Sequence, residues 1–190
     1  METVKQIFKN KKKYILIVVL VLVVIVTVWY CQKKTNEWKV GIDFSCVTIE
    51  EHNISGDSMD PLFVDGEIVK GLVGYYGCNK IERNDIAVLE FTSREEKFVK
   101  RIVGLPGDSV EFTKYGEIKI NEEILKNSNE KAYNFSLTSQ KLITIPLKVG
   151  KVPEGRYMVL GEDTGVSSFD SRKFAFLQKD HLIGKVIKNK

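Results

Sequence analysis

The sequence predicts a mainly β domain with antiparallel strands, preceded by one N-terminal transmembrane helix. Three observations support this fold class: an uncharged apolar run near the N-terminus, short runs rich in Val, Ile and aromatic residues, and turn signals between those runs. Beyond the apolar run, helical periodicity is confined to one short turn expected at residues 59–63. The 190 residues carry a formal net charge of +4, which is too small to indicate a nucleic-acid partner.

The apolar run has the length and the ends of a membrane anchor. It reads YILIVVLVLVVIVTVWY over residues 14–30 and contains no charge. As a helix it would span about 26 Å, close to the ~30 Å of a bilayer core. Tyr14, Trp29 and Tyr30 stand at its ends, where interfacial aromatic residues belong. We therefore expect a transmembrane anchor over residues 14–31.

The flanking charges predict the orientation of this anchor. Residues 1–13 form the denser basic cluster and should stay in the cytoplasm, which leaves the rest of the chain outside. A cleaved secretory signal is the alternative, but the run ends in Val28, Trp29 and Tyr30 rather than in small residues. Cys31 follows the bulky Tyr30, so lipoprotein cleavage is also disfavoured. The expectation is a single-pass protein of the cell membrane with an extracytoplasmic main domain.

Residues 37–190 are numerous enough for one domain with its own core. The runs of strand length are EIVKGLVGYY, DIAVLEF, KFVKRIVGL, SVEF, EIKI, RYMVLG and LIGKVI. Turn pairs such as DG, PG and YG separate them. Short strands joined by tight turns favour antiparallel pairing.

The three cysteines carry little information. Cys31, Cys46 and Cys78 lack the spacing of metal ligands. A bridge between Cys46 and Cys78 is compatible with the sequence but cannot be deduced from it, and buried or idle thiols are the preferred interpretation. The sequence contains no nucleotide-binding loop and no metal-ligand cluster, so no cofactor and no metal are expected.

Ser58, in the segment SGDSMDP, is a candidate nucleophile that needs a base. His52 and His181 lack the surroundings of a catalytic triad and are interpreted as surface histidines. Lys100 shares one strand face with Phe98 and Ile102, and poor solvation there would lower its pKa. On this segment alone, a lysine that extends from a half-buried strand to water is the favoured alternative.

Four motifs taken together favour a catalytic Lys100 over a lysine that only extends to water. They are SMDP at residues 58–61, NDIAVLEF at 84–91, KRIVGLPGD at 100–108 and GEDTGVSSFDSR at 161–172. In this order they resemble the type I signal peptidases, the membrane-anchored Ser/Lys proteases, in a compact Gram-positive-like form. The resemblance covers the anchor and nearly all of residues 45–187, and it implies an antiparallel β catalytic domain.

The resemblance also implies the roles of individual residues. Ser58 would attack the scissile carbonyl with Lys100 as its general base. Ser168 would hydrogen-bond and orient the lysine, while Asp170 and Arg172 would form a supporting ion pair and Arg101 would be structural. The last motif carries one residue more than the family pattern, so counting from its start selects Ser167, whereas the spacing to Asp170 selects Ser168. Where some relatives have an oxyanion serine this chain has Gly56, which leaves the Ser58 N–H and an unidentified donor.

Substrates of the resembled family carry small residues at positions −1 and −3 from the cut and bind as extended strands. The pocket residues expected here are Met59, Phe63, Ile68, Ile86 and Val88. Residues 111–151 are expected to form a short variable cap away from the chemistry.

The predicted function is a membrane-bound endopeptidase that removes N-terminal signal peptides from exported preproteins and contacts the lipid bilayer. One alternative is a specialised signal peptidase for pilin-like surface proteins, suggested by the irregular last motif and by Leu62, where the family prefers threonine. The other is a catalytically silent, anchored β module that binds peptides, although the presence of both Ser58 and Lys100 disfavours it. The particular preproteins and the oligomeric state do not follow from the sequence.

Overall fold

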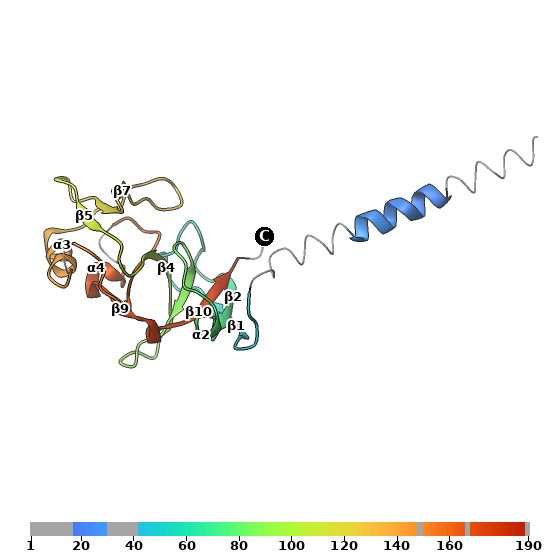
Figure 1. Cartoon of the computed structure of the whole chain (residues 1–190), viewed down its shortest axis with the longest axis horizontal. Helices are drawn as coiled ribbons and strands as arrows, with labels where there is room; N and C mark the ends of the chain where they lie inside the picture. The colour runs from blue at the N-terminus through green and yellow to red at the C-terminus, as the bar shows by residue number, and fades with distance from the viewer. Residues whose placement is uncertain (1–16, 30–41, 148–149, 166–167, 189–190) are drawn as a thin grey trace, which may run out of the picture. The chain divides into compact units, whose positions relative to one another are not determined.

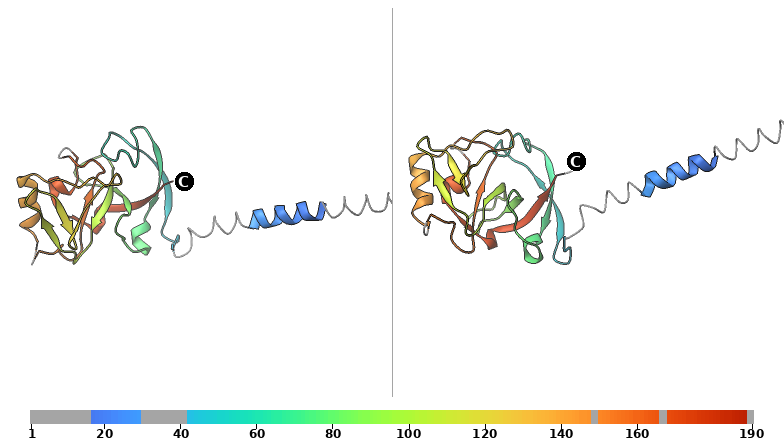
Figure 2. Two further views of the ribbon diagram at one scale, coloured as in Figure 1. Left: turned by 90° about the horizontal axis from the view of Figure 1, so that it is seen from above. Right: turned by 45° about the horizontal axis from the view of Figure 1, so that its top comes forward.

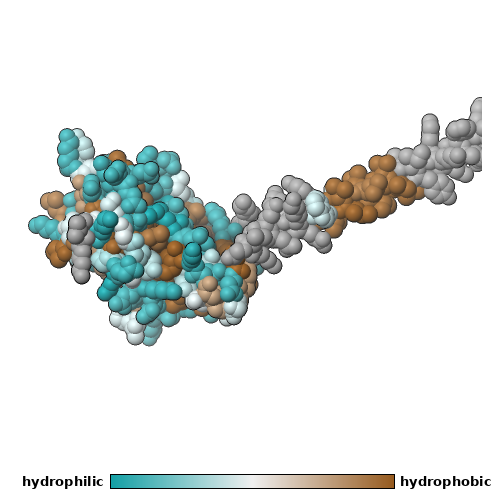
Figure 3. Space-filling model, viewed as in Figure 1, coloured by the Kyte–Doolittle hydropathy of each residue, from teal (hydrophilic) through white to brown (hydrophobic). Residues whose placement is uncertain are grey.

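The computed structural model describes residues 17–29, 42–147, 150–165 and 168–188. The chain divides into two compact units, Met1–Ile42 and Asp43–Lys190. In the first unit, residues 17–29 form a helix whose side chains are exposed and which Figure 3 shows as a continuous hydrophobic surface. Within the described residues, no helix combines the length and the apolar character needed to cross a membrane. The expected anchor over 14–31 extends beyond the described residues at both of its ends.

The second unit is built from two antiparallel sheets, which confirms the predicted mainly β class. The larger sheet has seven strands in the order β1-β2-β10-β3-β4-β8-β9, and the smaller has three in the order β5-β6-β7. The strands of the larger sheet are β1 (Thr48–Asn53), β2 (Ile68–Val73), β3 (Ile86–Leu89), β4 (Phe98–Gly104), β8 (Arg156–Leu160), β9 (Leu177–Gln178) and β10 (Leu182–Ile187). The smaller sheet comprises β5 (Val110–Phe112), β6 (Ile118–Ile120) and β7 (Glu123–Ile124).

Short helical segments connect the strands. They are α2 (Tyr75–Cys78), α3 (Leu137–Thr144), α4 (Ser171–Phe174) and the 3-10 turn η1 (Lys179–His181). The turn expected at residues 59–63 is present, since the Phe63 N–H donates to the Met59 carbonyl at 2.9 Å. The sequence analysis did not predict α3, although Ser136 caps it by accepting a hydrogen bond from the Ser139 N–H.

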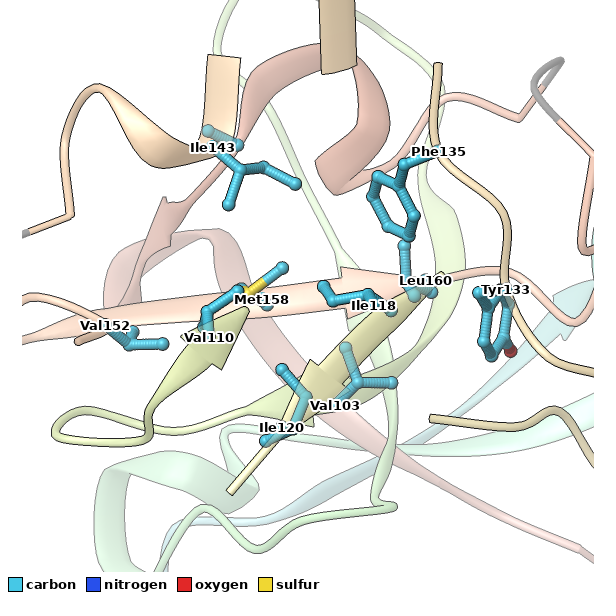
Figure 4. Close-up of a cluster of buried hydrophobic side chains, with 11 residues drawn as sticks. Val103, Val110, Ile118, Ile120, Tyr133, Phe135, Ile143, Val152, Met158 and Leu160 are labelled. Atoms are coloured by element: carbon cyan, nitrogen blue, oxygen red, sulfur yellow. The ribbon is translucent and has the colours of Figure 1, made fainter. Parts of the chain in front are cut away.

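The two ends of this domain have separate cores. In Figures 1 and 2 the smaller sheet and α3 lie at one end, and β1 and β2 lie at the other. The core at the first end packs the smaller sheet and α3 against β4 and β8 (Figure 4). It consists of Val103, Val110, Ile118, Ile120, Tyr133, Phe135, Ile143, Val152, Met158, Leu160 and Ala175. The core at the second end consists of Ile54, Met59, Phe63, Val69, Val88 and Val186.

The second core fixes the segment that carries Ser58. Met59 and Phe63 are each only 1% exposed, so the residue after the serine and the end of its turn are both buried. Burying one such side chain stabilises the fold by about 1.5–3 kcal/mol relative to leaving it exposed. The serine therefore stands on a turn held by apolar packing on its C-terminal side.

A disulfide joins Cys46 to Cys78, with a Cα–Cα distance of 6.1 Å and a sequence separation of 32. The interpretation of these cysteines as idle thiols was therefore wrong. The bridge connects the segment before β1 to the end of α2. Two such distant positions meet only in the folded chain, which is why spacing alone could not reveal the pair.

Candidate active site

The fold brings Ser58 and Lys100 into direct contact. Lys100 lies in β4, and its Nζ donates to Ser58 Oγ at 2.7 Å and to the Val99 carbonyl at 3.0 Å. The lysine is 3% exposed, whereas the serine is half-buried. A substrate could therefore reach the hydroxyl while the amine behind it stays out of water.

Burial changes the acid–base behaviour of this amine. It lowers the pKa of Lys100 to about 8, with the Asp170 carboxylate opposing that shift and the Arg172 guanidinium adding to it. With this pKa about one lysine in ten is neutral at pH 7, against about one in three thousand at the ordinary value. The direction agrees with the poor solvation expected in β4, where Lys100 pairs with the fully buried Ala87.

Asp170 and Arg172 form a fully buried ion pair at the start of α4. Arg172 Nε donates to Asp170 Oδ1 at 2.9 Å, and its Nη2 donates to Asp170 Oδ2 at 2.5 Å. The same two side chains also hold the preceding loop: Asp170 accepts from the Gly161 N–H at 2.9 Å, and Arg172 Nη1 donates to the carbonyls of Asp163 and Gly165. Removing either partner would leave a buried charge uncompensated, which typically costs about 3–5 kcal/mol.

The loop after β8 is hydrogen-bonded to the backbone of Ser58. The N–H groups of Glu162 and Asp163 donate to the Ser58 carbonyl at 2.8 and 3.3 Å. Gly161 comes so close that a Cβ added to it would lie 2.4 Å from the Ser58 oxygen. Only glycine permits this approach, so the first residue of the last motif has a steric role that the sequence analysis did not assign.

Ser168 is buried beside the same loop, at 6% exposure. Its Oγ donates to Asp163 Oδ2 at 3.4 Å. Among the hydrogen bonds of the described residues, none joins Ser168 to Lys100, so the expected orienting contact is not formed here. Ser167, the alternative, lies outside the described residues. A carboxylate such as that of Asp163 accepts the serine hydroxyl readily.

Arg101 has the structural environment that was expected of it. Its Nε lies 2.9 Å from Glu162 Oε1, and its Nη2 donates to the Tyr133 hydroxyl at 2.8 Å. That hydroxyl donates in turn to the Gly161 carbonyl at 2.8 Å. Burial raises the pKa of Tyr133 to about 12, so the hydroxyl remains a donor at neutral pH. These contacts connect β4 to the loop that holds Ser58.

A groove of about 380 Å³ adjoins the serine and the lysine. Its lining comes from the end of β1, the serine segment, the loop before β4 and the first half of β4. The lining residues are Asn53, Ile54, Ser55, Ser58, Met59, Glu96, Lys97, Phe98, Val99 and Lys100.

Only one of the five expected pocket residues lines this groove. Met59 does so, whereas Phe63 and Val88 are 1% and 0% exposed and belong to the core. Ile86 packs half-buried against that core, and Ile68 is 62% exposed on β2. The expectation selected apolar strand residues near the motifs, but β3 is an inner strand whose apolar side chains face the core.

Other residues that line the groove lie beside the two reactive side chains in the sequence. Phe98 and Val99 precede Lys100 directly, and Ile54 stands four positions before Ser58. Proximity in sequence to the lysine would have been a better guide to the lining than apolar character alone.

One edge of β4 is open beside the groove. Pairing between β4 and β8 begins at Arg101 and Leu160, so in the described part of the sheet no strand pairs with residues 98–100 on that side. Ile102 makes its backbone hydrogen bonds on the β3 side. Alternation along an antiparallel strand therefore turns the N–H and the carbonyl of Val99 toward the open side. An extended peptide could pair with them there.

Comparisons with known proteins agree on one family. A family model described as signal peptidase, peptidase S26, matches residues 10–188. Signal peptidase IB of Staphylococcus aureus (strain COL) is 30% identical over 171 residues, which cover 82% of this chain and 88% of the relative. Signal peptidase I of Bacillus caldolyticus is 31% identical over 137 residues, which cover 70% of this chain and 74% of the relative.

A solved structure of the same kind is also similar. The crystal structure of a signal peptidase I from Enterococcus faecalis V583 shares 28% sequence identity with a TM-score of 0.44, and the match covers 57% of this chain and 98% of that chain. The family model and the two relatives each match more than two thirds of the sequence. The chain therefore belongs to the signal peptidases of peptidase family S26.

Proposed function

We propose that Ser58 is the nucleophile and Lys100 the general base with which this serine endopeptidase removes N-terminal signal peptides from exported preproteins. The observation that carries the assignment is the 2.7 Å contact between a buried lysine amine and a half-buried serine hydroxyl. A serine hydroxyl needs an adjacent base, and an amine of lowered pKa can act as one near neutral pH.

The reaction follows from the protonation states of these two groups. The neutral amine of Lys100 takes the Ser58 proton as Oγ attacks the scissile carbonyl carbon. The resulting ammonium gives a proton to the leaving amine, the peptide bond breaks, and the signal peptide remains as an ester on Ser58. Lys100, neutral again, takes a proton from a water that attacks this ester. It returns that proton to Ser58 Oγ as the ester bond breaks, and the signal peptide leaves as a free acid.

The surrounding residues support the geometry of this reaction. The Ser58 carbonyl is fixed by the N–H groups of Glu162 and Asp163. The N–H of Ser58 donates to none of the carbonyls of the described residues, and we assign it as a donor for the oxyanion. Asp170 and Arg172 act as positioning residues, since they bind the same loop and bias the pKa of Lys100 in opposite directions. Ser168 belongs to this support through its contact with Asp163.

The signal peptide binds as an extended strand in the groove. Val99 offers backbone groups on the open edge of β4, and the chain after β1 also lines the groove. The apolar lining residues are Ile54, Met59, Phe98 and Val99. We assign these side chains to the walls that receive the small residues at positions −1 and −3 from the cut.

The protein is anchored in the cell membrane by residues 14–31, with residues 1–13 in the cytoplasm and the β domain outside. The apolar composition of the run and its aromatic ends support the anchor. The Cys46–Cys78 disulfide supports the external location of the domain, because disulfides persist in oxidising compartments.

A cleavage assay tests the proposal. Purified full-length protein in detergent is incubated with a panel of preproteins, and the cut sites are read by mass spectrometry. Cleavage at signal-peptide junctions, lost in Ser58→Ala, is expected. Absence of cleavage by the wild type, or full cleavage by Ser58→Ala, would contradict it. The two alternatives, a narrow pilin-like client set and a silent peptide-binding module, are not favoured, because the matched relatives are signal peptidases over most of the chain.

A further inference from the structure

The cap makes direct contact with the loop that holds the nucleophile. Its turn at residues 127–131 is organised by Asn127, which is 6% exposed. Asn127 Oδ1 accepts from the N–H groups of Asn129 and Lys131, both at 3.0 Å. Asn127 Nδ2 donates to the Glu162 carbonyl at 2.9 Å. One buried side chain therefore joins the turn at residues 127–131, part of the expected cap over 111–151, to the loop after β8.

A second hydrogen bond strengthens the same connection. The Ser128 N–H donates to Glu162 Oε2 at 2.7 Å, while Arg101 holds the other carboxylate oxygen at 2.9 Å. The N–H of Glu162 donates to the Ser58 carbonyl at 2.8 Å. Glu162 therefore connects Asn127 to Ser58. Its carbonyl accepts from Asn127, its carboxylate contacts Ser128 and Arg101, and its N–H donates to Ser58.

The chemistry of the asparagine side chain suits this position. An amide offers both an acceptor and donors, so Asn127 can close its own turn and still donate to Glu162. An aspartate could close the turn but would set a carboxylate oxygen against the Glu162 carbonyl. An alanine would lose both contacts and leave the buried Glu162 carbonyl without this donor.

We propose that Asn127 is a positioning residue for the reaction. It acts through Glu162, which holds the Ser58 carbonyl and thereby keeps the Ser58 hydroxyl within hydrogen-bonding distance of Lys100. The proposal rests on the proposed function of Ser58. Because Asn127 does not line the groove, its loss should lower kcat and leave KM nearly unchanged. A displacement of the nucleophile approaching 1 Å can reduce the rate by about 100-fold, so a smaller shift predicts a loss of about ten-fold or more.

The test compares Asn127→Asp with Asn129→Asp in the full-length protein in detergent. Both variants add the same charge to the same turn, but among the hydrogen bonds of the described residues none joins the Asn129 side chain to Glu162. Steady-state kinetics on a peptide with Ala at −1 and −3 should show kcat reduced about ten-fold or more in Asn127→Asp, with KM within about two-fold. Asn129→Asp should match the wild type.

Two further measurements separate positioning from a general loss of stability. Should Asn127→Asp fail to fold, Asn127→Ala takes its place, with Asn129→Ala as control. The pH midpoint of kcat/KM in Asn127→Ala should equal that of the wild type, because the surroundings of Lys100 are untouched. Wild-type kcat per folded molecule in the Asn127 variant, with only Tm lowered, would overturn the inference. Failure of the wild type to cleave would instead contradict the proposed function and is seen before any Asn127 variant is made.

Discussion

Gly161→Ala should disable the enzyme by displacing the backbone of the nucleophile. The added Cβ would lie 2.4 Å from the Ser58 carbonyl oxygen, whereas real contacts of this kind are at least 3.0 Å and mostly beyond 3.4 Å. The two backbones must therefore separate by about 0.6–1.0 Å, and a misplacement of about 1 Å can cost about 100-fold in rate. We expect kcat to fall by between about 10-fold and 100-fold.

The assay is peptide cleavage by detergent-solubilised enzyme, with Tm measured on the same samples. Gly77→Ala is the matched control, because a Cβ there would meet only Cys46 Sγ at 3.8 Å, an ordinary contact. A Gly161→Ala enzyme with kcat within about two-fold of the wild type would refute the reasoning, since the loop would then have moved without disturbing the serine.

Three other outcomes are expected. Ser58→Ala and Lys100→Ala should each lower kcat by about 100-fold or more in a folded protein, and the double variant should be hardly worse than either; near-wild-type activity of Lys100→Ala would end the dyad assignment. Replacing Cys46 and Cys78 by serine should lower the free energy of unfolding by about 3–4 kcal/mol in chemical denaturation, given a separation of 32 residues, while kcat of the folded protein stays unchanged; an unaltered denaturation midpoint would show that the bridge contributes nothing. N-terminal sequencing of membrane fractions should find the anchor retained, whereas a mature chain starting near Cys31 would contradict the anchor.

The sequence predicts the fold class well because strand-length apolar runs and turn pairs are local signals. The antiparallel β class was confirmed, and every predicted run except LIGKVI extends beyond its strand at one end at least. The helix α3 was not predicted because the neighbouring sequence is polar and the helix has few apolar side chains. Leu137 is 75% exposed, and of the residues in α3 only Ile143 belongs to the core. Its capping residue, Ser136, was the available signal.

The candidate site is predictable to the extent that it lies in short motifs. The 2.7 Å meeting of Ser58 and Lys100 agrees with the pairing expected from their motifs. Of the five expected pocket residues, Met59 alone lines the groove, because strand alternation does not say whether a buried face meets the core or a cleft. The hydrogen bond from the Ser168 hydroxyl to the Asp163 carboxylate could not be predicted from the motif, because it depends on how the loop folds.

Long-range contacts were beyond the sequence. The Cys46–Cys78 bridge joins positions 32 residues apart, and the Asn127 contact reaches 35 residues to Glu162. Each depends on where whole elements pack, which no local pattern encodes. The family resemblance predicted that residues 111–151 form a variable cap, and the most buried polar side chain of its turn at 127–131, Asn127, donates to the loop next to the nucleophile.

The pH dependence of kcat/KM tests most directly the claim that a buried lysine is the base. Lys100 acts in its neutral form, and its pKa is lowered to about 8 chiefly by burial, so activity should rise as the pH increases through about 8. The profile is measured on a peptide with Ala at −1 and −3, for the wild type and for Phe98→Ser, which admits water beside the amine and should move the rise to higher pH. A midpoint near 8 that moves upward in Phe98→Ser is the predicted result. A rise complete by about pH 7, as for a histidine base, and unmoved by Phe98→Ser would contradict the account.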